Sequence, residues 1–218
     1  MRALLEFYDS SVGKKLLVGL TGGMLISYLV IHLFGNLLMF RNDGGRAFDT
    51  YAEILPQIVV IRIIEIGLFG LFFFHIVTAT YTWFINKQAR DKKYDVRKPN
   101  ETSALSSRTM FLTGSIIFIF IVVHMRQFWF VSRYKAGEGF SMYEVVKGTF
   151  TDPVYGIFYI VAMFLLGYHL RHGFQSACQT FGLRAKKYEG LIEWIGTIFW
   201  LLIPLGFASM PIYFLLKF

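Results

Sequence analysis

The sequence predicts an all-α, polytopic membrane protein in which five transmembrane helices form a bundle. Of its 218 residues, 55% are hydrophobic and 17% are charged, whereas soluble domains average about 25% charged residues. Five apolar runs each reach the length of about 20 residues that a helix needs to cross a bilayer. The single cysteine, Cys178, excludes an internal disulfide. The chain is therefore expected to form one membrane domain spanning residues 1–218.

Each predicted helix is bounded by polar or helix-initiating residues. Lys14 and Lys15 mark the membrane boundary before the first helix. Pro56 and Pro153 suit the first turns of the second and fourth helices, where a missing N–H costs nothing. The predicted helices occupy residues 16–40, 57–86, 109–131, 153–181 and 191–216.

The segments between the helices are expected to lie outside the membrane. Residues 41–56 read as a short polar loop, and residues 87–108 form the most charged loop of the chain. Residues 132–152 form a mixed loop with room for a short interfacial helix. In the fifth helix, Pro204 and Pro211 predict kinks.

The distribution of Lys and Arg predicts the orientation of the chain. The N-terminal arm, the 87–108 loop and the 184–189 turn share one side and carry 3, 7 and 3 of these residues. The opposite side carries 2, 3 and 1. By the positive-inside rule the N-terminus is cytoplasmic and the C-terminus lies outside. The net charge of +8 is thereby explained without a nucleic-acid partner.

Four of the predicted helices carry a histidine at depth, and an imidazole inside a membrane usually has a function. At 1.5 Å per residue, His32 and His124 both lie about 22 Å from the cytoplasmic side. His75 lies about 12–16 Å and His169 about 16–18 Å from that side. Depth therefore predicts an outer pair, His32 with His124, and an inner pair, His75 with His169.

Two such pairs are the arrangement that two bis-histidine haems require. Any one of these histidines could instead be a hydrogen-bonded interhelical residue. Four in two matched levels favour the haem interpretation. Several small or polar residues lie within about a turn of a histidine and would leave room for a porphyrin edge: Gly35, Asn36, Thr78, Ala79 and Gly173.

Depth leaves the inner ligand of the fourth helix open. His172 lies about 4.5 Å nearer the cytoplasmic side than His169, and depth alone slightly favours it. The other histidine would hydrogen-bond a haem propionate or contact a neighbouring subunit. Arg126 near the outer level and Arg171 near the inner level are propionate candidates, although interfacial snorkelling explains each equally well.

The segments IHLFGN, FFHIVTATY, VVHMRQFW and YHLRHGFQSACQTFGL resemble a known family over nearly the whole chain. It is the di-haem cytochrome b anchor subunit of succinate dehydrogenases and fumarate reductases. The specific features are the four histidines in order and the H-x-x-x-G-x-x-S pattern that begins at His169. In that pattern the first histidine is the ligand, so the resemblance selects His169 over His172.

The resemblance also implies partners and cofactors. A flavoprotein with covalent FAD and an iron–sulfur subunit would dock on the cytoplasmic face of a bacterial inner membrane. The anchor would hold two haem b groups and exchange electrons with a quinone, which in this branch is menaquinone. Two copies of the whole complex could associate as a dimer. Some members carry a glutamate, proposed as a proton path, two residues before the fourth-helix ligand. Gly167 stands there in this chain, so the path is not carried over.

A quinone site needs a group that exchanges protons near the outer haem and water. Glu53, Arg62 and Glu65, at the outer start of the second helix, are the candidates. Arg62 and Glu65 are spaced i, i+3, so they also suit a neutralised interfacial ion pair.

Two other functions compete with the preferred one. The cytochrome b subunit of a hydrogenase or formate dehydrogenase also holds haem through membrane histidines. A small transporter or channel would use intramembrane charges as a pathway, but the chain has few Asp or Glu at mid-membrane depth and no obvious repeat.

Overall fold

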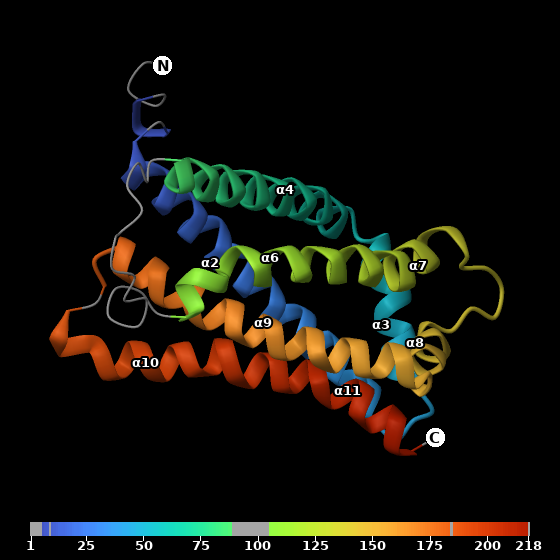
Figure 1. Cartoon of the computed structure of the whole chain (residues 1–218). Coiled ribbons are helices and arrows are strands. Elements are labelled where there is room, and N and C mark those ends of the chain that lie inside the picture. Colours follow the sequence, from blue (N-terminus) through green and yellow to red (C-terminus); the bar gives the residue numbers. More distant parts are fainter. Residues whose placement is uncertain (1–5, 9, 89–104, 184, 218) are drawn as a thin grey trace.

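The computed structural model describes residues 6–8, 10–88, 105–183 and 185–217, which form helices without any strand. Five helical segments within these ranges are long and apolar enough to cross a membrane, so the all-α polytopic prediction is confirmed. They run side by side in one bundle (Figure 1). The first begins and the fifth ends at opposite ends of the bundle, as an odd number of spans requires (Figure 1).

The first three spans come from α2, α4 and α6. Helix α2 (Ser11–Asn36) continues into a 3₁₀ turn, η1 (Leu37–Phe40). Helix α4 covers Val59–Gln88. Helix α6 (Leu105–His124) passes through a π-turn, η3 (Met125–Trp129), into α7 (Phe130–Tyr134). The predicted 87–108 loop is helical at both of its ends, and its residues 89–104 lie outside the described residues.

The last two spans pack against one another along their length. Helix α9 covers Pro153–Thr180, and Asp152 caps it by accepting from the Val154 backbone N–H at 2.8 Å. Pro153 lies in its first turn, as predicted. After η4 (Lys186–Tyr188), the fifth span consists of α10 (Glu189–Thr197), a π-turn η5 (Ile198–Leu202) and α11 (Ile203–Lys217).

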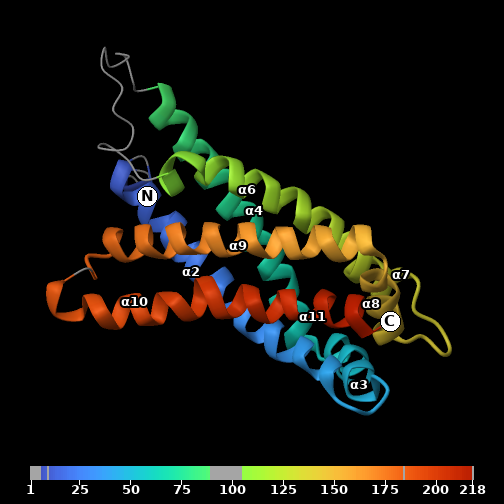
Figure 2. The ribbon, with the colours of Figure 1, turned by 60° about the horizontal axis from the view of Figure 1, so that its bottom comes forward.

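Helix α9 is the centre of the bundle. It packs against α2, α6 and α11, whereas α4 packs mainly against α2 and lies at the edge. Figure 2 shows α9 between α6 and the α10–α11 span. Of the five spans, α9 buries the largest share of its most apolar window and α4 the smallest. The histidine on α4 therefore reaches the bundle chiefly through α2.

The end of the bundle where α2 ends and α4 begins, called the outer end here after the predicted orientation, holds two short helices. The 41–56 segment is not merely a loop, because it contains α3 (Arg46–Ile54) and a 3₁₀ turn, η2 (Leu55–Gln57). Asp43 starts α3 by accepting from the backbone N–H groups of Gly45 at 3.0 Å and Ala47 at 3.1 Å. Pro56 lies in η2, ahead of α4, so its predicted place in the first turn of that helix was wrong.

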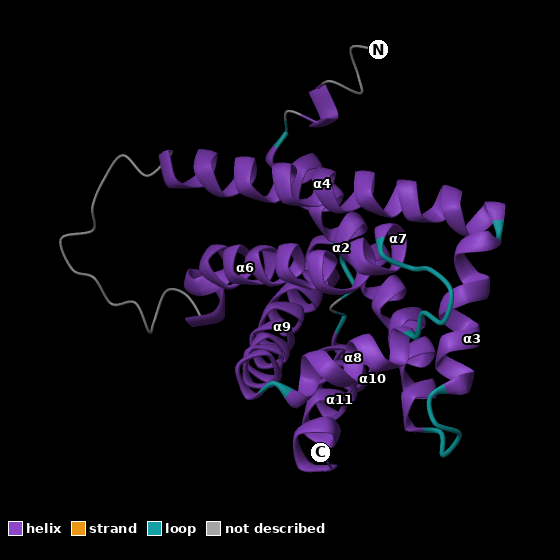
Figure 3. Ribbon diagram, turned by 90° about the vertical axis from the view of Figure 1, so that its right-hand side faces the viewer, coloured by secondary structure: helices purple, strands orange, loops and turns teal. Residues whose placement is uncertain are grey.

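The predicted interfacial helix is present as α8 (Met142–Thr151). Asp49 of α3 accepts hydrogen bonds from the Ser141 hydroxyl and the Tyr143 backbone N–H, both at 2.7 Å. We call this contact the α3–α8 clasp. Figure 3 looks onto this end, where α3 and α8 lie near the end of α11. Beneath the clasp, Phe214 and Met39 are among the most deeply buried side chains.

The irregularity expected at Pro204 takes the form of η5 directly ahead of it. Proline has no N–H to give to the carbonyl four residues earlier, which is that of Trp200. That carbonyl lies against Gly167 of α9, where an added Cβ would come within 2.7 Å of it. Any side chain at position 167 would therefore have to displace the backbone of the fifth span.

Candidate functional site

The four deep histidines come from four different helices. His32 of α2 and His124 of α6 have ring centroids 5.9 Å apart, with their planes nearly perpendicular at 87°. Of the inner pair, His75 lies on α4 and His169 on α9, and each has a threonine hydroxyl beside its Nδ1 atom. The structure thus brings the rings of the outer pair into contact, whereas the pairing of His75 with His169 stays a prediction.

Each of the four rings has a polar side chain beside its Nδ1 atom. In the inner pair, the Thr21 hydroxyl lies 2.9 Å from Nδ1 of His75, and the Thr113 hydroxyl lies 3.4 Å from Nδ1 of His169. In the outer pair, Asn36 Nδ2 lies 3.4 Å from Nδ1 of His32, and the Tyr159 hydroxyl lies 3.5 Å from Nδ1 of His124. All four contacts are made at Nδ1, so none of them engages the Nε2 atom of a ring.

Aromatic rings enclose the outer pair. Tyr28 stacks on His32 with a centroid distance of 5.4 Å, and Phe207 packs on it at 5.5 Å. The rings around His124 are those of Phe120, Phe128 and Tyr159. The two outer imidazoles are therefore surrounded mostly by aromatic side chains.

The space around the histidines differs from the prediction in one respect. Gly35 does not leave an open edge, because the Tyr51 ring fills the space beside it and would lie 2.5 Å from an added Cβ. The glycines that do face the rings are Gly22 and Gly114. An added Cβ there would lie 3.3 Å from Cε1 of His75 and 3.4 Å from Cε1 of His169, respectively.

Other residues expected near the two levels have varied surroundings. Thr78, one turn after His75, is fully buried, and in the described part of the chain its hydroxyl has no hydrogen-bond partner. Arg171 lies over the Trp200 ring at 5.1 Å. Arg126 is exposed in the π-turn directly after His124. His172 is partly exposed.

Glu65 is the centre of a charged cluster near the outer end of α4. The predicted contact with Arg62 is confirmed at 3.3 Å. Sequence reasoning missed two further donors, Arg133 of α7 at 2.6 Å and the indole N–H of Trp129. The pair of Glu65 and Arg133 is the more buried, since their side chains are 19% and 15% exposed.

The cluster borders an open, largely apolar cavity of about 610 Å³, which Ile66 and Phe69 also line. Tyr28, which stacks on His32, lies on α2, the helix that packs against α4. Glu53 does not join the cluster. Its backbone carbonyl accepts from the Gln57 side chain at 3.2 Å.

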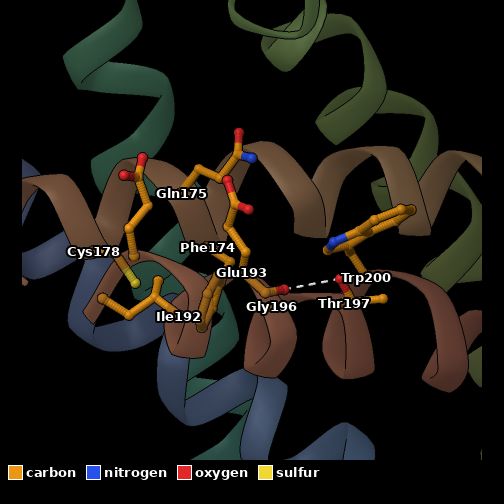
Figure 4. Close-up of a pocket in the computed structure, with 9 residues that line it drawn as sticks. Phe174, Gln175, Cys178, Ile192, Glu193, Gly196, Thr197 and Trp200 are labelled. Atoms are coloured by element: carbon orange, nitrogen blue, oxygen red, sulfur yellow. Dashed lines mark hydrogen bonds between the residues drawn. The ribbon is translucent and has the colours of Figure 1, made fainter. Parts of the chain in front are cut away.

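A second, smaller pocket of about 160 Å³ lies between α9 and α10 (Figure 4). In it the Thr197 hydroxyl donates to the Glu193 carbonyl at 2.8 Å. None of the predicted site residues lines this pocket. Its lining consists of Phe174, Gln175, Cys178, Glu189, Ile192, Glu193, Gly196, Thr197 and Trp200.

The model of the succinate dehydrogenase/fumarate reductase transmembrane subunit family matches residues 86–205, more than half of the chain. The chain belongs to this family. It is therefore a multi-pass membrane anchor subunit with a place in electron transport, as the sequence resemblance predicts. The matched part of the anchor subunit contains His124 and His169, whereas His32 and His75 precede it. Comparison with curated proteins and with solved structures finds no significant match.

Proposed function

We propose that this anchor subunit carries electrons between an iron–sulfur partner and a membrane quinone through two b-type haems. His32 and His124 would hold the outer haem, and His75 and His169 the inner one. The observation that carries the proposal is the contact of His32 with His124, together with a polar side chain beside Nδ1 of each of the four imidazoles. A bound haem supplies reversible one-electron transfer at its iron.

The residues present fit such a group in two ways. The rings of His32 and His124 come from facing helices with centroids 5.9 Å apart, and both have their polar contact at Nδ1 and not at Nε2. Among the residues that the structure describes, no three His, Cys, Asp or Glu side chains converge on one point. Pairs of imidazoles therefore suit a metal whose other ligands come from its own macrocycle.

One contact favours His169 over His172 as the inner ligand. His169 has the Thr113 hydroxyl beside its Nδ1. A ring that a hydrogen bond at its other nitrogen orients is the usual setting of a metal ligand. The role of His172 and of Arg171 and Arg126 as propionate partners stays a prediction.

We place quinone chemistry at Glu65 rather than at Glu53. Glu65 lines the open apolar hollow and holds Arg62, Trp129 and Arg133 around it, whereas Glu53 lines neither that hollow nor this cluster. A carboxylate at this position would exchange protons with a bound quinone, while Arg62 and Trp129 would orient its head group. Menaquinone is the quinone that the family resemblance implies.

The partners would dock where the inner pair is nearest to the surface. The N-terminal arm and the 184–189 turn carry basic residues at that end, which we place in the cytoplasm of a bacterium. A flavoprotein with FAD and an iron–sulfur subunit would complete the complex there, and the complex is compatible with a dimer.

Purification of the whole complex with haem quantitation tests this proposal. Reduced-minus-oxidised spectra should show b-type bands and about two haems per chain. Alanine at position 32, 75, 124 or 169 should remove one haem each, whereas His172→Ala should retain both. A folded complex with full loading but one haem per chain would contradict the paired arrangement.

The quinone assignment has its own test. Glu65→Gln should retain both haems and lower quinone turnover by about 10²-fold or more, the usual contribution of a general acid–base group. Glu53→Gln is the matched control and should behave like the wild type. Equal losses in both variants would place the quinone elsewhere.

A further inference from the structure

Two threonines contact the inner histidine pair, and their hydroxyl protons are already committed. The Thr21 hydroxyl donates to the Leu17 carbonyl at 2.8 Å, with the Val18 carbonyl at 3.2 Å. The Thr113 hydroxyl donates to the Met110 carbonyl at 3.0 Å. Both threonine side chains are buried, at 5% exposure each. Water therefore does not compete for these contacts.

The tautomer of each inner histidine follows from this arrangement of protons. A hydroxyl has one proton, and when a carbonyl takes it the oxygen can only accept from another group. While the threonines keep these backbone bonds, the nitrogen beside each oxygen is the donor, so Nδ1–H of His75 donates to Thr21 and Nδ1–H of His169 donates to Thr113. In neutral imidazole this leaves the lone pair on Nε2.

The two threonines occupy equivalent places in two helices. Leu-Thr-Gly occurs at residues 20–22 of α2 and again at 112–114 of α6. His32 follows Thr21 by eleven residues, and His124 follows Thr113 by the same eleven. An aromatic residue four positions before each of these outer histidines packs on its ring. Each of the two helices thus presents one imidazole at the outer level and one hydroxyl acceptor at the inner level.

The glycine of each Leu-Thr-Gly segment brings the next helix close. The added Cβ at Gly22 or Gly114 would approach Cε1 of the facing ring to 3.3 or 3.4 Å, which is closer than most real Cβ contacts. The threonine and the glycine of each segment therefore face the same imidazole. The packed helix pairs α2 with α4 and α6 with α9 share this arrangement.

We propose that Thr21 and Thr113 are positioning residues that fix His75 and His169 in the Nδ1–H tautomer and present their Nε2 atoms to the inner haem. The inference rests on the proposed function. Because a hydrogen bond at Nδ1 makes an imidazole a stronger donor to a metal, losing it should raise the midpoint potential of the inner haem and weaken its retention. The shorter contact, 2.9 against 3.4 Å, predicts a larger effect at Thr21 than at Thr113.

The test compares valine and serine at each position in the purified complex. Thr21→Val nearly keeps the shape but removes the acceptor, and we expect an upward shift of one of the two haem potentials with about 10–100-fold weaker haem retention. Thr21→Ser keeps the hydroxyl and should restore the wild-type potential. Thr82→Val is the matched control, because Thr82 makes the same kind of backbone hydrogen bond, at 2.7 Å to the Thr78 carbonyl, and has no hydrogen bond to a histidine among the described residues. A redox titration monitored by absorption spectroscopy gives the midpoint potential of each haem separately.

The outcomes separate this inference from the proposed function. A folded wild-type complex without haem would overturn the proposed function itself. A wild type with two haems, together with a Thr21→Val variant of unchanged potential and haem content, would overturn the positioning role alone. A Thr82→Val variant that shifts the inner haem as much as Thr21→Val would also overturn it, since the effect would then come from helix packing.

Discussion

Replacing Arg133 with glutamine should destabilise the protein several times more than the same replacement at Arg62. Both guanidinium groups donate to the same Glu65 oxygen, but from different surroundings. Arg133 reaches it at 2.6 Å with only 15% of its side chain exposed. Arg62 reaches it at 3.3 Å with 46% exposed.

The expected magnitudes follow from these distances and exposures. A hydrogen bond between charged, poorly exposed groups contributes about 1.5–3 kcal/mol, so Arg133→Gln should cost about 2–3 kcal/mol. An exposed i, i+3 ion pair on one helix contributes about 0.2–0.5 kcal/mol, so Arg62→Gln should cost less than about 1 kcal/mol.

Unfolding free energies in mixed micelles, measured for both variants and for each combined with Glu65→Gln, give the two coupling energies. The coupling of Arg133 to Glu65 should be near 2 kcal/mol, and that of Arg62 should be below about 0.5 kcal/mol. Equal couplings would refute the reasoning, because they would mean that the contact between spans is no more shielded from solvent than the contact within α4.

Three further predictions concern the outer end and the glycines. Asp49→Ala breaks both hydrogen bonds of the α3–α8 clasp and should lower the free energy of unfolding by about 3 kcal/mol. The exposed Glu144→Gln should lower it by less than about 0.5 kcal/mol. Similar losses in the two variants would show that the clasp stabilises the protein no more than a surface ion pair does. Gly22→Ala should alter the spectrum of the inner haem, whereas Gly23→Ala, whose added Cβ meets nothing within 4 Å, should add about 0.5–1 kcal/mol of stability with an unchanged spectrum. Burial raises the pKa of Tyr51 above its ordinary 10.0, so the stabilisation that the protonated phenol gives is complete below that pH and is lost as the pH rises through the folded-state pKa. Tyr51→Phe should lack this step in alkaline unfolding curves, and an unchanged curve would contradict it.

The fold and the contact of His32 with His124 were predictable because both depend on length and depth. A bilayer fixes how many apolar residues a helix needs, and the rise per residue converts position into depth. The depth of His32 and His124 therefore indicated their contact without any knowledge of the packing. The i, i+3 contact of Arg62 with Glu65 was predictable for a similar reason, because helix geometry alone determines it.

Contacts between distant segments were not predictable in this way. Arg133 and Trp129 lie more than 60 residues from Glu65, and the π-turn before Arg133 changes which face of the helix it occupies. Helix α3 was missed because the 41–56 segment has few apolar residues, and its start depends on a local cap by Asp43. Gly35 was misread because small size in sequence does not reveal that the Tyr51 ring occupies the space.

The threonines at the inner pair had a signal in the sequence that was not recognised. The Leu-Thr-Gly segments at 20–22 and 112–114 stand at the same distance from a histidine. Only the structure shows that each one serves the histidine of the following span rather than the one on its own helix.

The π-turn at Met125–Trp129 rotates the part of the span that follows it around the helix axis relative to the part that precedes it. An extra residue in a turn advances everything beyond it by about 100° around the helix axis. His124 lies before this offset, whereas Arg133 lies after it. Loss of one residue from the turn would leave the imidazole aimed as before and would swing the guanidinium away from Glu65. The proposed electron-carrying part and the proposed proton-exchanging part of this span are thus separable, and each can change in evolution without re-aiming the other.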